Sequence, residues 1–123
     1  MGGRITHLVV ASCTGFVAPG IDQIIARRLG LGDVERTLVG FMGCYAAVSS
    51  LRTAYHIVRS EPDARVLAVT VELCSLHLQE TQSLESLLAI LQVSDGAAAA
   101  LVTGDPGGFE MSRFFSLELE DSA

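Results

Sequence analysis

The sequence contains no lysine, so its positive charge comes from arginine. The chain has eight arginines and 14 acidic residues, which gives a formal net charge of −6. Only Arg27 and Arg28 are adjacent, whereas proteins that bind nucleic acid gather basic side chains into a patch or a stripe. The charge pattern therefore argues against nucleic acid as a partner.

Cysteine is scarce, and long apolar runs are missing. Cys13, Cys44 and Cys74 are the only cysteines, and no two of them form a CxxC pair. An odd number of widely spaced cysteines argues against a disulfide framework or a zinc site and favours a reducing, cytoplasmic setting. We expect no metal and no bound cofactor. No apolar run approaches the roughly 20 residues that span a bilayer, so we expect no membrane span.

The apolar pattern predicts one α/β domain over residues 1–123. Half of the residues are apolar, and a chain of this length suits a single domain. Apolar, β-branched runs predict strands at residues 5–12, 34–41, 64–73 and 97–104, and alternation predicts another at 111–121. Helical spacing predicts helices at residues 21–29, 44–59 and 84–92, with Ser83 as the cap of the last. This order favours a mixed, mostly parallel sheet flanked by helices.

Two further expectations follow from this pattern. The helix at residues 44–59 is apolar nearly all round, apart from a narrow polar stripe, so it should be almost fully enclosed. The last predicted strand breaks off at Ala123, where a domain would normally continue. We therefore expect a partial or truncated domain.

Cys44 stands where a buried strand turns into a buried helix. A free cysteine has a pKa of about 8.5 and is roughly 3% thiolate at neutral pH. The unpaired N–H groups and the dipole of a helix N-terminus favour the thiolate and could receive an oxyanion, as acyl transfer requires. Free cysteine is also among the most buried residue types, so inert packing is the alternative. The local pattern leaves both interpretations open.

Four segments carry a wider resemblance. They are ITHLVVASCTGFVAPGIDQIIARRLGL (residues 5–31), GFMGCYAA (40–47), ARVLAVTVELCSLHLQ (64–79) and SDGAAAALV (94–102). In this order and at these spacings, they resemble the central part of a type III polyketide synthase, of the chalcone/stilbene synthase-like family. The resemblance runs from about residue 5 to residue 105 and implies about half of a thiolase-like layered fold.

The resemblance implies that Cys44 is an acyl-carrying nucleophile. In that family the cysteine accepts an acyl group from a CoA thioester, and decarboxylation of malonyl-CoA yields an enolate that attacks the bound thioester. Acyl-CoA and malonyl-CoA would therefore be substrates rather than bound cofactors. The resemblance also implies a homodimer, with residues 34–41 and the helix after Cys44 near its two-fold axis.

The resemblance assigns further positions to the substrate pocket. Those that match the family's pocket are Cys13, Thr14, His77 and Val93, and Ala18 matches a residue that reaches across the dimer into the neighbouring pocket. Val93 replaces the usual gatekeeper phenylalanine, which would widen the entrance and alter the choice of starter unit. The alternative is a β-branched residue that only packs at a strand edge.

The family's catalytic histidine and asparagine find no match here. None of His7, His56 and His77 lies in the matching motif, so turnover by this chain alone is doubtful. The alternative functions are a non-catalytic dimerisation or assembly module, which could pair with a complementary fragment, and a ketoacyl synthase III-like fragment. The last would need a basic docking patch for acyl carrier protein, which the sequence does not offer.

Overall fold

Four strands form one mixed sheet in the order β2-β1-β3-β4. The computed structural model of the protein describes residues 4–117. Its elements are β1 (His7–Ala11), α1 (Ile21–Arg28), β2 (Glu35–Val39), α2 (Ala46–Ser60), β3 (Arg65–Glu72), the 3₁₀ helix η1 (Cys74–His77), α3 (Leu84–Leu91) and β4 (Gly96–Thr103). The four strands and three α-helices over residues 5–104 confirm the predicted α/β order.

The pairing of the strands brings their loops to one edge of the sheet. β1 runs parallel to both β2 and β3, with Ala11 opposite Val39 and Thr70. β4 runs antiparallel to β3 and begins at Gly96, opposite Glu72. The carboxyl ends of three strands and the amino end of β4 therefore meet at the same edge. Within residues 4–117, β4 is also an outer strand of the sheet.

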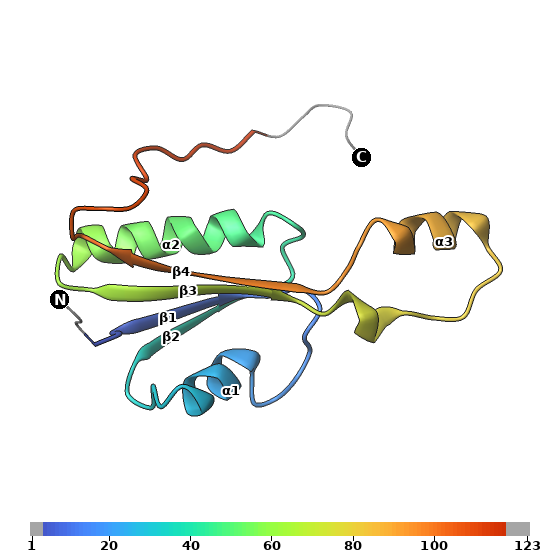
Figure 1. The fold of residues 1–123 in the computed structure, drawn as a ribbon, viewed down its shortest axis with the longest axis horizontal. Helices are drawn as coiled ribbons and strands as arrows, with labels where there is room; N and C mark the ends of the chain where they lie inside the picture. The colour runs from blue at the N-terminus through green and yellow to red at the C-terminus, as the bar shows by residue number, and fades with distance from the viewer. Residues whose placement is uncertain (1–3, 118–123) are drawn as a thin grey trace.

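Helices α1 and α2 cover opposite faces of the sheet (Figure 1). β1 alternates between them, because Leu8 and Val10 pack with Ala26 of α1, whereas Val9 packs with Ala54 of α2. Leu8, Val9 and Val10 are fully buried. Such a strand, apolar on both faces, is typical of a parallel sheet that is covered on both sides.

The expectation that α2 would be almost fully enclosed is wrong for this chain. Only Ala46, Ser50 and Ala54 of α2 are buried, and the Val48 side chain is half exposed. The physical reason is that α2 lies in an outer layer, with the sheet on one side. The helix also begins at Ala46 rather than at Cys44.

The strand predicted at residues 111–121 is not formed over residues 111–117, and residues 118–121 lie outside the described part of the chain. This segment instead passes over α2 (Figure 1). The Phe114 ring lies 5.5 Å from the Tyr55 ring, and the Arg52 guanidinium lies 5.7 Å from the centre of the Phe114 ring. Alternation alone does not make a strand when no neighbouring strand is there to pair with.

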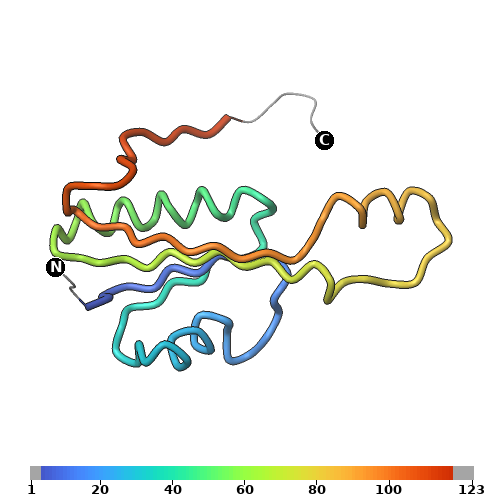
Figure 2. The backbone as a smooth tube through the Cα atoms, viewed as in Figure 1, coloured from blue at the N-terminus to red at the C-terminus, as the bar shows by residue number. Residues whose placement is uncertain are grey.

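Between β3 and β4 the chain makes a long excursion away from the sheet, which we call the arm (residues 73–95; Figure 2). It contains η1 and α3. As predicted, Ser83 caps α3, because its side chain accepts a hydrogen bond from the Ser86 N–H. No residue of α3 is buried. Among the described residues, no helix combines the length and the apolar character that crossing a membrane requires.

Candidate active site

A cavity of about 500 Å³ opens at the sheet edge where the strand ends meet. Its walls come from the loop after β1, the turn before α2, the end of β3 and the start of β4. Most of the lining side chains are small: Ala11, Cys13, Thr14, Gly43, Cys44, Ala46, Ala47, Thr70, Val71, Glu72, Cys74, Val93, Gly96, Ala97 and Ala98. A mostly apolar hollow with a few polar groups is the usual form of a small-molecule site.

A tight turn presents Cys44 to this cavity. Phe41 and Gly43 have positive φ angles of 56° and 82°, so the chain reverses between β2 and α2. The Ala46 N–H donates to the Gly43 carbonyl at 3.2 Å, and Tyr45 occupies the N-cap position of α2. Cys44 is exposed and stands just before the first turn of the helix. Its position beside the helix N-terminus agrees with the sequence analysis, although it precedes the helix rather than beginning it.

Glu72 holds the loop on the other side of the cavity. Its carboxylate accepts hydrogen bonds from the Cys13 N–H at 2.9 Å and from the Thr14 hydroxyl at 2.6 Å. The Thr14 hydroxyl oxygen also accepts from the Leu73 N–H at 2.7 Å. Bonds to an ionised carboxylate are among the stronger hydrogen bonds in proteins. The end of β3 thus fixes the backbone after β1.

The structure brings together four of the residues that the sequence singled out. Cys44, Cys13, Thr14 and Val93 all line the cavity. The side chain of Val93 is about half exposed, and its role as a gatekeeper stays a prediction.

Two predicted pocket residues lie outside this lining. His77, in η1, lies behind the loop after β1, with its Nε2 atom 2.9 Å from the Thr14 carbonyl oxygen. Ala18 lies in the same loop and precedes Pro19 through a cis peptide bond. Its contribution across a dimer stays a prediction.

Glu72 and Cys74 are two of the lining residues that the sequence analysis missed. A signal for Glu72 was present, since a carboxylate at the end of an apolar strand needs a partner when the strand end is covered. Cys74 follows two residues later, at the start of η1. The alanines of β4 gave no signal, because small apolar residues also fit a buried strand.

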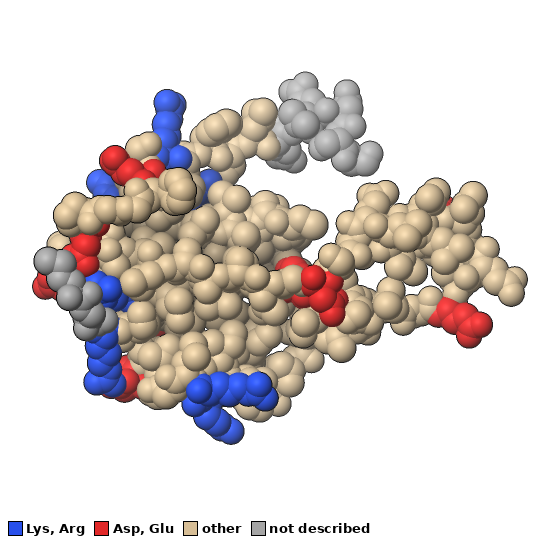
Figure 3. All heavy atoms as spheres, in the orientation of Figure 1, with Lys and Arg blue, Asp and Glu red and all other residues tan. Residues whose placement is uncertain are grey.

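Charge is distributed unevenly around the site. The arm has no arginine, and its charged residues are Glu80, Glu85 and Asp95. On the face drawn in Figure 3, positive side chains lie over the body of the molecule, whereas acidic ones lie on the body, on the arm and at its base. None of the three histidines is among the lining residues in the part of the chain described here. Within the same residues, no group of three or more candidate ligands is placed to hold a metal ion.

Asp95 fastens the base of the arm. Its carboxylate accepts hydrogen bonds from the Ser75 hydroxyl at 2.5 Å and from the Ser75 N–H at 2.7 Å. These two hydrogen bonds lower the pKa of the Asp95 carboxyl from its usual value of 3.8, and the bond from the Ser75 hydroxyl has the larger effect. The two ends of the arm are thereby tied together beside the cavity.

Comparison with known proteins points to one family. The family model described as the N-terminal domain of chalcone and stilbene synthases matches residues 2–106. An alpha-pyrone synthesis polyketide synthase-like protein from Mycobacterium tuberculosis is 40% identical over 127 aligned positions, which cover 97% of this chain and 32% of that protein. A probable polyketide synthase from Dictyostelium discoideum is 39% identical over 105 residues, covering 85% of this chain and 3% of that protein. The chain thus spans a third or less of these relatives.

Solved structures agree with the sequence matches. The C-terminal type III polyketide synthase domain of Steely1 from Dictyostelium has a TM-score of 0.76 at 37% identity, over 86% of this chain and 30% of that one. A polyketide synthase from the brown alga Ectocarpus siliculosus has a TM-score of 0.77 at 39% identity, over 83% of this chain and 27% of that one. These matches confirm the predicted fold, a layered, mostly parallel sheet that makes up part of a thiolase-like domain.

Proposed function

Because the chain belongs to the chalcone and stilbene synthase family through its N-terminal domain, we propose that Cys44 carries the acyl group in a type III polyketide synthase reaction. The observation that carries this proposal is the position of Cys44. Cys44 is exposed, lines a cavity of about 500 Å³ and lies just before the N-terminus of α2.

The first step of the proposed reaction is acyl transfer to Cys44. Its thiolate attacks the carbonyl carbon of an acyl-CoA, the new thioester bond forms, and the CoA thiolate leaves. The positive end of the α2 dipole stabilises the oxyanion of the tetrahedral intermediate. The small side chains of Ala46 and Ala47 leave room for the acyl group beside the sulfur.

The second step extends the acyl chain. Malonyl-CoA loses CO₂, the resulting enolate attacks the thioester carbonyl, and the Cys44 thiolate leaves. This step needs groups that polarise the thioester carbonyl, and the histidines of the described chain do not line the cavity. We propose that a further polypeptide segment supplies these groups and that a reducing, cytoplasmic setting keeps the thiol free.

Val93 is the proposed selector of the starter unit. It lines the cavity at the end of the arm, together with the small residues at the start of β4. A valine occupies less space than the phenylalanine that the family resemblance leads us to expect there. The wider opening favours starter units with bulkier or longer acyl chains.

An assembly module is the second candidate function, and the exposed leucines of the arm favour it. Leu84, Leu87, Leu88 and Leu91 follow helical spacing on α3 and are 44% to 79% exposed. A helix with such an apolar face is stabilised when another protein surface covers it. As an assembly module, the chain would bind a complementary segment or a second copy of itself without turning over substrate.

Acyl loading distinguishes the two candidates. The protein is incubated with hexanoyl-CoA at neutral pH, and its mass is measured before and after treatment with hydroxylamine, which cleaves thioesters. We expect one hexanoyl group on Cys44, with Cys13 and Cys74 in the same chain as internal controls. The Cys44→Ser variant, checked for folding by circular dichroism, should carry none.

Two results would contradict the catalytic proposal. One is acylation spread equally over the three cysteines, which would indicate surface reactivity without a site. The other is no acylation of a folded protein at millimolar hexanoyl-CoA, which would leave the assembly module as the better explanation.

A further inference from the structure

All three cysteines of the chain reach the same cavity. They come from three separate places: Cys13 from the loop after β1, Cys44 from the turn before α2 and Cys74 from the start of η1. All three are free thiols in the structure. The proposed acyl transfer uses only Cys44, so the other two thiols need an explanation of their own.

Cys13 is the thiol with a direct link to the Cys44 turn. Its sulfur donates a hydrogen bond to the Gly43 carbonyl oxygen at 3.5 Å. That carbonyl belongs to the peptide bond that leads into Cys44, and its oxygen lies roughly 2.8 Å from the Cα atom of Cys44. The Cys13 sulfur is therefore at most roughly 6.3 Å from that Cα atom.

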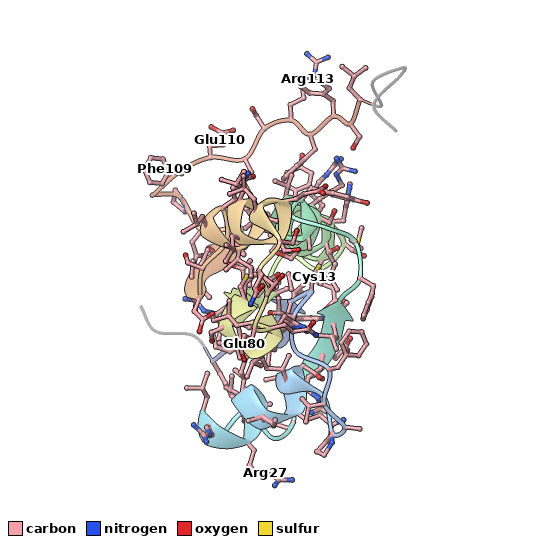
Figure 4. The ribbon with its side chains drawn as sticks, turned by 90° about the vertical axis from the view of Figure 1, so that its right-hand side faces the viewer. Cys13, Arg27, Glu80, Phe109, Glu110 and Arg113 are labelled. Atoms are coloured by element: carbon pink, nitrogen blue, oxygen red, sulfur yellow. The ribbon has the colours of Figure 1, made fainter. Side chains whose placement is uncertain are left out.

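The fold maintains this proximity. β1 and β2 are neighbouring parallel strands in register at Ala11 and Val39, and the Ser12 N–H still donates to the Val39 carbonyl at 3.1 Å. The two loops thus leave the sheet side by side. The Glu72 carboxylate accepts a hydrogen bond from the Cys13 N–H at 2.9 Å, which fixes the backbone of the loop that carries Cys13. In Figure 4, Cys13 lies near the centre of the molecule, whereas Arg27 and Arg113 point outward.

From this arrangement we propose that Cys13 is the resolving thiol of Cys44, and that the two form a reversible disulfide when the protein meets a hydroperoxide. Both residues lie outside the helices and strands, so their sulfur atoms can approach without breaking the sheet. A disulfide needs Cα atoms about 4.4 to 6.8 Å apart, so the link requires the two loops to reach this separation.

The chemistry takes two steps. The Cys44 thiolate attacks one oxygen of the hydroperoxide, the S–O bond forms and the O–O bond breaks, so that a sulfenic acid and a hydroxide or alkoxide result. The Cys13 thiol then loses its proton and attacks the sulfenic sulfur, the S–S bond forms, and the leaving hydroxide takes up that proton as water. Two thiols are oxidised, and the peroxide is reduced.

This disulfide would protect the acyl-carrying thiol. Further oxidation of a sulfenic acid gives sulfinic and sulfonic acids, which are generally irreversible, whereas a dithiol reduces a disulfide. While the bond exists, Cys44 has no thiolate to attack an acyl-CoA. The inference rests on the proposed function only in needing a reactive Cys44 thiol.

Hydrogen peroxide tests the inference. The reduced protein is treated with a small molar excess at low protein concentration, and peptides are mapped without reduction. We expect an intramolecular Cys13–Cys44 link that dithiothreitol reverses. In Cys13→Ser we expect Cys44 sulfenic acid instead, trapped by dimedone, followed by sulfinic acid. The matched variant Cys74→Ser should still form the Cys13–Cys44 link.

The contrary outcomes are distinct. A link from Cys44 to Cys74, a link only between chains, or sulfinic acid forming equally fast in the wild type and Cys13→Ser would overturn the role of Cys13. Incubation of the same reduced sample with hexanoyl-CoA distinguishes failure of the Cys13 proposal from failure of the proposed acyl transfer to Cys44. Loading without the disulfide rejects the resolving thiol alone, and a Cys44 inert to both reagents rejects both.

Discussion

At the scale of single residues, the backbone between β2 and α2 decides where the sulfur of Cys44 lies. The positive φ angles of Phe41 and Gly43 turn the chain, and the Gly43 carbonyl accepts from both the Ala46 N–H and the Cys13 thiol. Glycine suits this position because a Cβ atom disfavours the left-handed region. The turn therefore depends on Gly43 more than on the cysteine that it presents.

We expect Gly43→Ala to destabilise the protein by about 1–2 kcal/mol, because alanine must adopt a φ angle of 82° there. It should also slow acylation of Cys44, since the turn shifts. Gly32→Ala is the control, because a Cβ atom at Gly32 has open space and no left-handed φ is required. Thermal unfolding of both variants checks the difference. Equal melting temperatures for Gly43→Ala and Gly32→Ala would contradict the argument.

At the scale of elements, the arm is fastened at its base by the contact between Asp95 and Ser75. The contact joins the start of η1 to the residue before β4, so it closes the loop that carries α3. Its hydrogen bonds lower the pKa of Asp95, so the ionised carboxylate favours the folded arm. Stability from this contact is present above the ordinary pKa of 3.8 and is lost as the pH falls through the lower, folded-state pKa.

The titration of Asp95 tests this contact. In the wild type we expect the midpoint of its carboxyl group, followed by NMR, to lie below 3.8. Ser75→Ala removes the hydroxyl bond, which is the first cause of the shift, so the midpoint should rise toward the ordinary value. Ser83→Ala, which alters the cap of α3 on the same arm, should leave the midpoint unchanged. A midpoint that is insensitive to Ser75→Ala would disprove the assignment.

How much of this the sequence could predict depends on how local each signal is. The β-branched run around Val66 and Val69 predicted β3, and Ser83 before a leucine-rich segment predicted the cap of α3. The start of α2 was placed too early because the φ angle of Phe41 is not visible in a sequence. The role of Glu72 was missed because its partners, Cys13 and Thr14, are distant in the chain.

At the scale of the whole molecule, exposed aromatic side chains gather beside the cavity. Phe16 and Phe41, from the loops after β1 and β2, have ring centres 4.0 Å apart and are 69% and 70% exposed. Tyr45 is 59% exposed and belongs to the turn that carries Cys44. An aromatic cluster of this kind is typical of a protein–protein interface. It agrees with the homodimer that the family resemblance implies, in which this end of the sheet would face a second copy.

We expect light scattering at low micromolar concentration to give the mass of a dimer. Phe41→Ser should shift the mass toward that of a monomer, because it removes an aromatic side chain from the proposed interface. Phe109→Ser is the control, since Phe109 is fully exposed in the segment after β4. Loss of the dimer in both variants, or a monomeric wild type, would count against this interface.

The position of β4 affects how the protein behaves in solution. Residues 96–101 are exposed, carry mostly methyl side chains and lie on an outer strand of the described sheet. Their outward N–H and C=O groups can hydrogen-bond to any extended peptide, whatever its side chains. We therefore expect high protein concentration to favour pairing of β4 between chains, and a peptide strand paired with β4 to prevent it.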